Sequence, residues 1–400
     1  MTDAKLSLDH VYRASHVLKS VIRPTSLIKT PSLGAEVYIK PENLQVTGSF
    51  KVRGAGYMIS QLTPEERQRG VIACSAGNHA QGVALAARSY GIPATICLPE
   101  GAPISKVEAT RSYGAEICLV PGVYDDAYQY ALKLMEERNL AFVHPFDNPL
   151  VIAGQGTIGL EILDELADVE QIIVPIGGGG LASGVAYAVK QLNPSIKVYG
   201  VQAEGAPSMF RSVNDGKIEC LPSVHTIADG IAVKKPGDNT FELCRTLLDG
   251  IVTVSEDEIC AAILMLLEDK KLIAEGAGAV SVAAALYNKV PVEGKKTVCI
   301  VSGGNIDVNF LNRIVSRGLE KSGRKCFLNI ETPDKPGQLV RISEIIASLG
   351  ANITAVSHER TASTEDVTGC VLRVALETRD HAHCRQIHDA LAEAGYKFKD

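Results

Sequence analysis

Short runs of apolar residues alternate with helical patterns along most of the chain. After the run at 70–76, for example, Ala80, Val83 and Ala87 are spaced three and four residues apart, as on one face of a helix. Runs rich in Val and Ile that alternate with helices are typical of a parallel sheet covered on both faces. The pattern predicts an α/β fold with strands within 70–76, 93–99, 115–120, 171–176, 197–204 and 296–304.

The pattern changes near residue 322. A short basic stretch, KSGRK at 321–325, is typical of a linker between domains. Beyond it, residues 326–400 predict strand, helix, strand, strand, helix and strand, with Pro336 at the start of the first helix and Gly350 just after its end. The order βαββαβ is that of a ferredoxin-like α+β unit. We therefore expect a separate small domain at 326–400.

Composition and charge exclude several classes of protein. The 400 residues are 46% apolar and 5% aromatic with no Trp, and 40 Lys and Arg against 46 Asp and Glu give a net charge of −6. This balance lacks the basic footprint of a nucleic-acid-binding protein. No apolar run approaches the ~20 residues that span a bilayer, and the first residues are polar where a signal peptide would be basic and then apolar. We expect a cytoplasmic protein with neither a nucleic-acid nor a membrane partner.

The ten cysteines are scattered without a CxxC pair, which is typical of buried thiols in a reducing compartment. One group of metal-binding residue types, His381, Cys384 and His388, would share a helix face. Their spacing is not that of a zinc finger, and no fourth ligand accompanies them. A polar helix surface is the favoured interpretation, and no metal is predicted.

Glycine is enriched, at 36 of 400 residues, and four glycines occur in succession. Gly177, Gly178, Gly179 and Gly180 follow the run IIVPI and open a helical pattern at Leu181. Such a turn offers backbone N–H groups and a helix N-terminus to a phosphate. A tight packing turn is one alternative. Another is a dinucleotide site of the form G-x-G-x-x-A, although the turn comes late in the chain for that fingerprint.

A lysine lies among small residues in the segment 47–55, TGSFKVRGA, directly after an aromatic residue. Most lysines are solvated surface residues, but small neighbours and an adjacent ring suit a lysine beside a planar ligand. Proximity to another cation would lower the pKa of Lys51 and make it a usable nucleophile or base. Together with the glycine turn, Lys51 points to pyridoxal 5'-phosphate, held covalently at Lys51 and through its phosphate at 177–180.

Several motifs occur in one order along the chain: PENLQVTGSFKVRGA (41–55), SAGNHAQGVA (75–84), AGQGTIGLEI (153–162), GGGGLASG (177–184), AEGAGA (274–279) and SGGN (302–305). With these motifs the chain resembles the fold-type II pyridoxal-phosphate enzymes of the serine/threonine dehydratase family, specifically the threonine dehydratases (threonine ammonia-lyases).

The resemblance covers about residues 5–320 and implies a two-lobed catalytic part, similar to tryptophan synthase β, with parallel sheets. Residues 1–45 and 147–322 would form the large, cofactor-binding lobe and residues 46–146 the small lobe. The tail at 326–400, with DKPG and GANI motifs, is similar to an ACT domain, a module that binds amino acids in regulated enzymes.

The resemblance also implies roles for single residues. Lys51 would hold the cofactor and then act as the base at the substrate Cα, while Ser302 would face the pyridine nitrogen. The remaining cofactor contacts would be Phe50, Asn78, Glu275 and residues Gly177, Gly178, Gly179, Gly180 and Leu181. The substrate carboxylate would be bound by Ser75, Asn78 and His79.

The implied activity is β-elimination of L-threonine to 2-oxobutanoate and ammonia, and of L-serine to pyruvate, in isoleucine biosynthesis. A branched-chain amino acid bound by the ACT-like domain is the expected effector, and a homodimer or homotetramer is the expected assembly. The expected effector contacts are Asp334, Gly337, Gly350 and Asn352.

Three other functions are alternatives. The similar serine racemases carry a second serine where Ala76 stands here, and acidic metal ligands where Gln202 and Ser208 stand, which disfavours racemisation and a magnesium site. A nicotinamide-dependent dehydrogenase would use the glycine turn. A non-catalytic amino-acid sensor would retain the fold without the chemistry, although Lys51 and Ser302 are both present.

Overall fold

The computed structural model describes residues 5–360 and 369–399. The chain divides into two compact units, Met1–Asp307 and Val308–Asp400. No helix among the described residues is long and apolar enough to cross a membrane.

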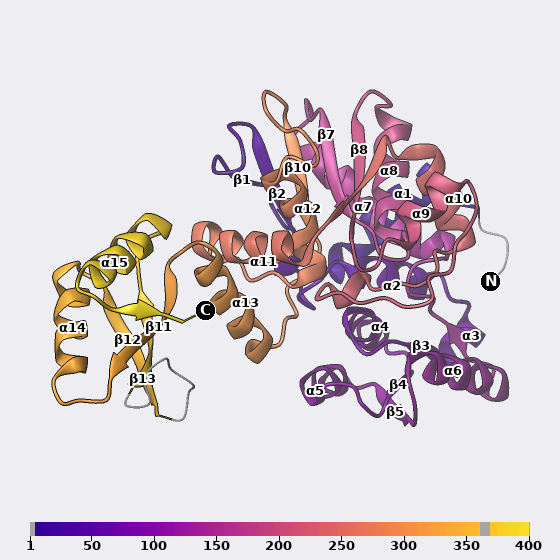
Figure 1. Cartoon of the computed structure of the whole chain (residues 1–400). Helices are drawn as coiled ribbons and strands as arrows, with labels where there is room; N and C mark the ends of the chain where they lie inside the picture. Colours follow the sequence, from indigo (N-terminus) through magenta and orange to yellow (C-terminus); the bar gives the residue numbers. More distant parts are fainter. Residues whose placement is uncertain (1–4, 361–368, 400) are drawn as a thin grey trace. The chain divides into compact units, whose positions relative to one another are not determined.

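The larger sheet of the first unit has six strands in the order β1-β2-β10-β7-β8-β9. All neighbours are parallel except β1 and β2, and Figure 1 shows β10, β7 and β8 side by side. Alternate residues of β7, Ile172 and Val174, pack with α7 and α8 in one apolar cluster. The strands are β1 (Ile28–Lys29), β2 (Val37–Pro41), β7 (Gln171–Pro175), β8 (Lys197–Ala203), β9 (Gly250–Val254) and β10 (Thr297–Val301).

The smaller sheet of the first unit is parallel throughout, in the order β5-β4-β3-β6. It lies within the predicted small lobe, 46–146, whereas the six-stranded sheet is built from residues outside that range. Its strands are β3 (Val71–Cys74), β4 (Ala94–Pro99), β5 (Glu116–Val120) and β6 (Ala141–Phe142).

Helices connect these strands as the alternating pattern predicts. The helices of the first unit are α1 (Leu8–Val17), α2 (Lys51–Ser60), α3 (Pro64–Arg69), α4 (Asn78–Ser89), α5 (Ile104–Ser112), α6 (Tyr124–Arg138), α7 (Pro149–Glu165), α8 (Gly180–Leu192), α9 (Ser208–Asp215), α10 (Asp238–Leu247), α11 (Glu256–Met265) and α12 (Gly276–Leu286), and a short 3-10 turn η3 covers Asp229–Ile231. Ala80, Val83 and Ala87 of α4 are all buried, so their stripe faces the core. The predicted α/β fold with parallel sheets is confirmed.

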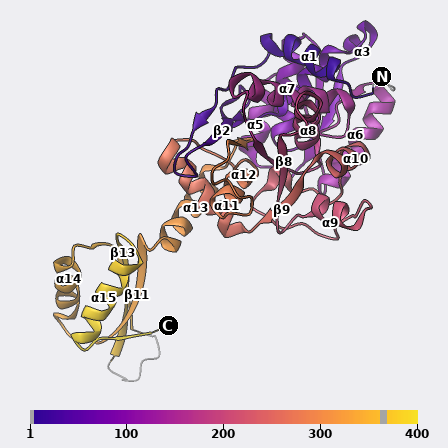
Figure 2. The same cartoon turned by 90° about the horizontal axis from the view of Figure 1, so that it is seen from above.

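The second unit is an antiparallel sheet with two helices on one face. Its elements are α13 (Val308–Lys321), β11 (Lys325–Pro333), α14 (Gln338–Ser348), β12 (Asn352–Glu359), β13 (Gly369–Glu377), α15 (His381–Glu393) and β14 (Lys397–Phe398). The sheet order is β12-β13-β11-β14. Ile342 and Ile346 of α14 and Leu391 of α15 pack with the strands in one core. Figure 2 shows α14 and α15 beside this sheet. From β11 onward, the element order is the βαββαβ order that the sequence predicts.

The division between the units differs from the sequence prediction. We expected the first part to extend to residue 322 and a linker at 321–325, but the boundary follows Asp307 and α13 belongs to the second unit. The basic stretch forms a tight turn, in which Gly323 has a φ of +69° and its carbonyl accepts a 2.6 Å hydrogen bond from Thr378 Oγ1. Strand β11 begins at Lys325, directly after this turn. The segment 321–325, whose composition is typical of a linker, therefore forms the tight turn between α13 and β11.

Candidate active site

Lys51 is the first residue of α2 and is partly buried. Its Nζ donates a 3.1 Å hydrogen bond to the carbonyl of Pro145 and lies 5.2 Å from the centre of the Phe50 ring. Burial lowers the pKa of Lys51 to about 8, although the nearby Glu275 carboxylate acts in the opposite direction. An amine with this pKa is partly neutral near physiological pH and can act as a nucleophile or a base.

The segment that carries Lys51 is joined to the SGGN motif by backbone contacts. Ser49 and Gly303 form an isolated antiparallel bridge, and the Phe50 N–H donates to the Ser302 carbonyl at 3.1 Å. The Asn305 amide donates to the Thr47 carbonyl at 2.7 Å. These bonds position residues 47–51 beside the loop that follows β10, which brings Lys51 and Ser302 to one site.

Asn78 and Glu275 form a hydrogen-bonded pair beside this loop. Asn78 Nδ2 donates to Glu275 Oε1 at 2.6 Å, while Asn78 Oδ1 accepts from the Asn305 amide at 2.8 Å. Glu275 is 4% exposed, and its N–H donates to the Gly303 carbonyl at 3.1 Å. Burial, together with the nearby Asp229 carboxylate, raises the pKa of Glu275 to about 7, although the hydrogen bond from Asn78 acts in the opposite direction.

The four glycines form a close-fitting turn between β7 and α8. Gly179 adopts a φ of +101° as the N-cap of α8, a conformation that other residues rarely adopt. A Cβ at Gly178 would overlap the Phe146 ring, and one at Gly180 would lie 2.9 Å from the Phe146 Cα. Phe146 follows Pro145, whose carbonyl accepts from Lys51, so the glycine turn and the lysine share one wall. The predicted contact Leu181 is buried in the core behind this turn.

The predicted substrate contacts lie at the N-terminus of α4. Ser75 Oγ accepts a 3.2 Å hydrogen bond from the Gly77 N–H. The His79 ring is 3% exposed, and its Nε2 lies 2.8 Å from the Val143 carbonyl, which can only accept. Burial lowers the pKa of His79 to about 3, so this ring is neutral. The backbone N–H groups of the first helical turn remain the donors for an anion here.

Ser302 directly follows β10, which ends at Val301, and is 3% exposed. Its hydroxyl donates to the Ala277 carbonyl at 3.3 Å. In the same region Ser49 is fully buried, and its hydroxyl has no hydrogen-bond partner among the described residues. Unpaired buried hydroxyls are costly, which favours a ligand at this position.

Several site residues were missed by the sequence analysis. Thr240 Oγ1 donates to the Gly178 carbonyl at 2.6 Å, and Phe146 fills the space that side chains at 178 and 180 would occupy. Asp147 accepts from the Thr240 N–H at 3.0 Å. No local pattern marks these residues, although Asn305 could have been noticed because it belongs to the SGGN motif.

The residues that the sequence analysis singled out elsewhere lie in the following surroundings. Gln202 bonds the Phe210 N–H at 2.8 Å and is fully buried, and Ser208 is buried. In the second unit, His381 contacts the Lys321 carbonyl at 2.9 Å, Cys384 contacts the Gly323 carbonyl at 3.2 Å, and His388 stacks on Phe398.

The expected effector contacts lie at the two ends of α14. Asp334 and Gly337 precede the helix, and Gly350 follows it with a φ of +79°. Asn352 begins β12 and donates to Glu377 at 2.9 Å.

The site fits pyridoxal phosphate. A lysine amine of lowered pKa suits the aldehyde of the cofactor, and a glycine turn at a helix N-terminus suits its phosphate. A buried serine hydroxyl suits its ring nitrogen. A fold of two largely parallel sheets with this site defines a class of cofactor-dependent α/β enzymes.

Comparison with protein families matches residues 18–303 to the family described as "Pyridoxal-phosphate dependent enzyme". The match spans most of the chain, and the chain belongs to this family. It is therefore an enzyme that depends on pyridoxal phosphate. The nicotinamide alternative for the glycine turn is not supported.

Individual proteins of known name agree with this assignment. The chain is 51% identical to an L-threonine ammonia-lyase of Thermotoga maritima over 398 residues, which cover 98% of this chain and 99% of that protein. The processed form of threonine deaminase isoform 2 from Solanum lycopersicum has a TM-score of 0.74 at 39% identity, covering 77% of this chain and 92% of that one. Maize serine racemase has the same TM-score at 37% identity, covering 80% and 99%.

Proposed function

We propose that this enzyme eliminates the β-hydroxyl of L-threonine as water, and that hydrolysis of the resulting enamine then gives 2-oxobutanoate and ammonia. L-Serine would give pyruvate and ammonia in the same way. The observation that carries the proposal is the Lys51 amine of lowered pKa, directed to a wall shared with a glycine turn. The near-complete coverage of a threonine ammonia-lyase at 51% identity supports the choice of substrate.

The side chains divide the work of this reaction. Pyridoxal phosphate, when bound, supplies the electron sink that stabilises negative charge at the substrate Cα. Lys51 Nζ takes the Cα proton, because its lowered pKa leaves part of the amine neutral. The N-terminus of α4 orients the substrate carboxylate through backbone N–H groups at Asn78 and His79. Ser302 offers a neutral hydroxyl to the ring nitrogen, which does not force that nitrogen to be protonated as a carboxylate would.

Racemisation of serine is a second candidate, which the similarity to maize serine racemase favours. Racemisation needs a proton donor on the face of the substrate opposite Lys51. Position 76, where the similar racemases carry a serine, is alanine here, and its methyl group cannot donate a proton. Elimination is therefore the stronger proposal.

The second unit is proposed to regulate the first. A branched-chain amino acid would bind near Asp334, Gly337, Gly350 and Asn352, in an assembly of two or four copies, and the product would enter isoleucine biosynthesis. Support comes from the ferredoxin-like order of the unit and from the turn at each end of α14, where Gly337 and Gly350 have positive φ. Titrating isoleucine and valine against the full chain, with Asp334→Ala as the variant, tests this part.

The catalytic proposal is tested with Lys51→Ala and a matched control, Lys133→Ala. Lys133 lies on α6, and its side chain is 70% exposed. Formation of 2-oxobutanoate from L-threonine should fall by at least the ~10²–10⁴-fold typical of a lost general base in Lys51→Ala and stay unchanged in Lys133→Ala. Borohydride should trap the cofactor on the peptide that contains Lys51. Retention of the wild-type rate in Lys51→Ala would refute the proposal.

A further inference from the structure

Three side chains of metal-binding types meet in the second unit, far from one another in sequence. Asp334 follows β11, His358 lies on β12 and Cys370 lies on β13. Their ligand atoms all lie within 4.8 Å of one another. His358 Nε2 is 2.8 Å from Cys370 Sγ and 3.7 Å from Asp334 Oδ1. A carboxylate, an imidazole and a thiol at such distances can turn to one shared ion.

The strand register explains why these residues meet. Cys370 is paired with Thr332, and His358 is paired with Leu372, two residues further along β13. Residues opposite each other in an antiparallel pair share a face, as do residues two apart in one strand. His358 and Cys370 therefore lie on the same face of the sheet, and Asp334 follows Thr332 by two residues.

A buried hydroxyl beside the cluster also lacks a partner. Thr332 is 4% exposed, lies directly opposite Cys370, and its Oγ1 has no hydrogen-bond partner among the described residues. Buried polar atoms are rarely left without one, and such an atom beside three possible ligands indicates a polar occupant.

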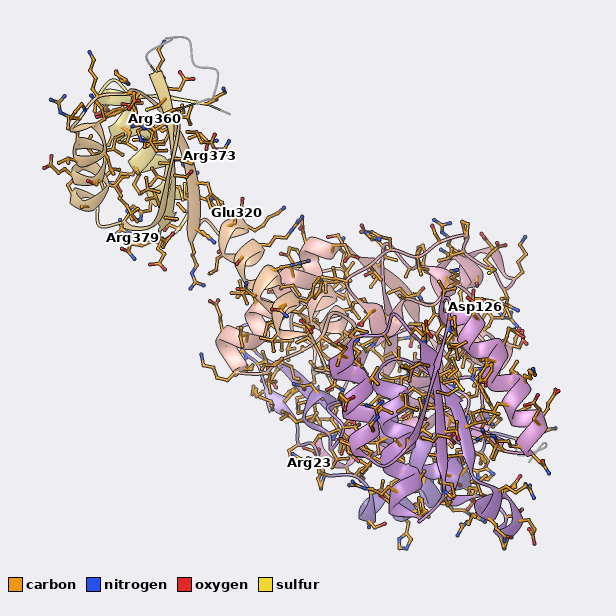
Figure 3. The ribbon with its side chains drawn as sticks, turned by 90° about the horizontal axis from the view of Figure 1, so that it is seen from below. Arg23, Asp126, Glu320, Arg360, Arg373 and Arg379 are labelled. Carbon is orange, nitrogen blue, oxygen red and sulfur yellow. The ribbon has the colours of Figure 1, made fainter. Side chains whose placement is uncertain are left out.

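The carboxylate is already oriented toward the cluster. Arg360 Nε donates to Asp334 Oδ2 at 2.9 Å, and its Nη2 lies 3.5 Å from Oδ1, the oxygen that is also 3.7 Å from His358 Nε2. Figure 3 labels this arginine in the second unit. Residues that hold a ligand from behind in this way are usual around protein metal sites.

We propose that Asp334, His358 and Cys370 form a binding site for a divalent transition-metal cation of the zinc class. On binding, the Cys370 thiol loses its proton to solvent and a sulfur–metal bond forms. The three ligands replace water molecules of the hydrated cation, which are released to solvent. The Asp334 and His358 side chains are 37% and 40% exposed, so water can complete the coordination.

The ligand types select the metal. Thiolate and imidazole favour zinc and its neighbours in the transition series, whereas magnesium and calcium prefer sites made of oxygen alone. The inference lies outside the proposed reaction and does not depend on it, because all three ligands belong to the second unit.

The test measures Zn²⁺ binding to the full-length holoenzyme by isothermal titration calorimetry. We expect one ion per chain, with affinity reduced at least tenfold in Cys370→Ser and in His358→Gln, since even residues behind a ligand contribute about 10–100-fold. Cys384→Ser is the matched control, because this second-unit cysteine contacts the Gly323 carbonyl. It should bind Zn²⁺ as the wild type does.

A second measurement does not depend on any variant. Cobalt(II) bound by the unmutated protein should show the intense visible bands of a tetrahedral site, which Zn²⁺ then displaces. Mg²⁺ should displace nothing. Absence of zinc binding to the wild type, unchanged affinity in both cluster variants, or cobalt spectra without these bands would each overturn the proposal.

Discussion

Charged groups lie in the core of the first unit but at the rim of the second. Arg53 and Glu42 are both fully buried, and Arg53 Nε and Nη2 hold the two carboxylate oxygens at 2.7 and 2.8 Å. In the second unit, the described core cluster is apolar, and pairs such as Arg373 with Glu359 are largely exposed. Burying charges costs desolvation free energy, so we interpret this buried pair as one that fixes the position of its helix more than it adds stability.

Arg53 of this buried pair lies two residues after the candidate catalytic lysine, Lys51. Arg53 also bonds Glu161 on α7, so it ties α2 to both the segment after β2 and to α7. The charges of Glu42 and Glu161 outweigh the effect of burial and raise the pKa of Arg53. Helix α2 is thereby fixed where it presents Lys51.

The largest expected effect comes from removing this guanidinium. Arg53→Met should lower the free energy of unfolding by about 3–5 kcal/mol, because it leaves the buried Glu42 without its partner. Arg373→Met, in an exposed pair of the second unit (Figure 3), should cost about 0–1 kcal/mol. Urea unfolding of both variants gives the comparison. Equal losses would show that burial does not separate the two pairs.

The second prediction asks whether the two units depend on each other. Leu391 is fully buried in the core of the second unit, and Leu391→Ala should destabilise that unit by about 2–5 kcal/mol. Hydrogen exchange should rise in β11 and β13, while the rate with L-threonine, measured without effector, stays unchanged. Leu339→Ala, at a position 45% exposed, is the control. A parallel loss of catalytic rate would contradict independent units.

The sequence predicted the strands of the first unit unequally well. The apolar runs predicted six parallel strands, because buried parallel strands are apolar on both faces, and all six were found, although the edge strand β5 is only partly buried. Strand β2 was missed, in part because Lys40 interrupts its apolar pattern, and that lysine is buried against Glu161 at 2.8 Å. A buried charge of this kind becomes recognisable only when its distant partner is known.

The same limit applies to the candidate site. Gly177–Gly180 and Lys51 stand out locally, and the structure places them along one wall. Phe146 and Thr240 have no local signal, because their role comes only from packing on the glycine turn. The cluster of Asp334, His358 and Cys370 was likewise invisible in sequence, since strand register alone brings its members together.

The third prediction concerns pH and the buried carboxyl of Glu275. Its pKa of about 7 is above the ordinary 4.5, so the folded apoprotein keeps a proton that the unfolded chain loses between these values. Stability should therefore fall as the pH rises from 4.5 to 7, by about 3 kcal/mol at 1.36 kcal/mol per pH unit. Glu275→Gln retains an acceptor for Asn78 and should remove this dependence.

The measurement is urea unfolding of the apoprotein at pH 4.5 and pH 8. Glu275→Gln should match the wild type at the lower pH and exceed it at the higher one. Glu320→Gln, at an exposed position of α13 in the second unit (Figure 3), should follow the wild type at both. A variant that is less stable than the wild type at pH 8 would contradict the expected sign.

The smallest expected effect belongs to an ion pair between two elements of the first unit. Lys106 on α5 contacts Asp229 of η3 at 2.6 Å, with side chains 21% and 58% exposed. Turn η3 lies beside the site, because a Cβ at Gly230 would be 3.3 Å from Glu275 Oε1 and one at Gly177 would be 3.0 Å from the Ile231 Cα. The Lys106–Asp229 pair therefore links α5, which belongs to the region of the smaller sheet, to η3. Turn η3 lies between Glu275 and the glycine turn at Gly177.

An exposed pair contributes only about 0–1 kcal/mol, so Lys106→Met should raise the KM for L-threonine by about fivefold at most. Lys133→Met, which removes an exposed partner of Glu137 on α6, should leave KM unchanged. Lys106 also lowers the pKa of Glu275 while Asp229 raises it, so Lys106→Met should shift any pH dependence due to Glu275 upward. A KM change without that shift would mean that the pair only positions η3, whereas a shift without a KM change would mean that it acts only through charge.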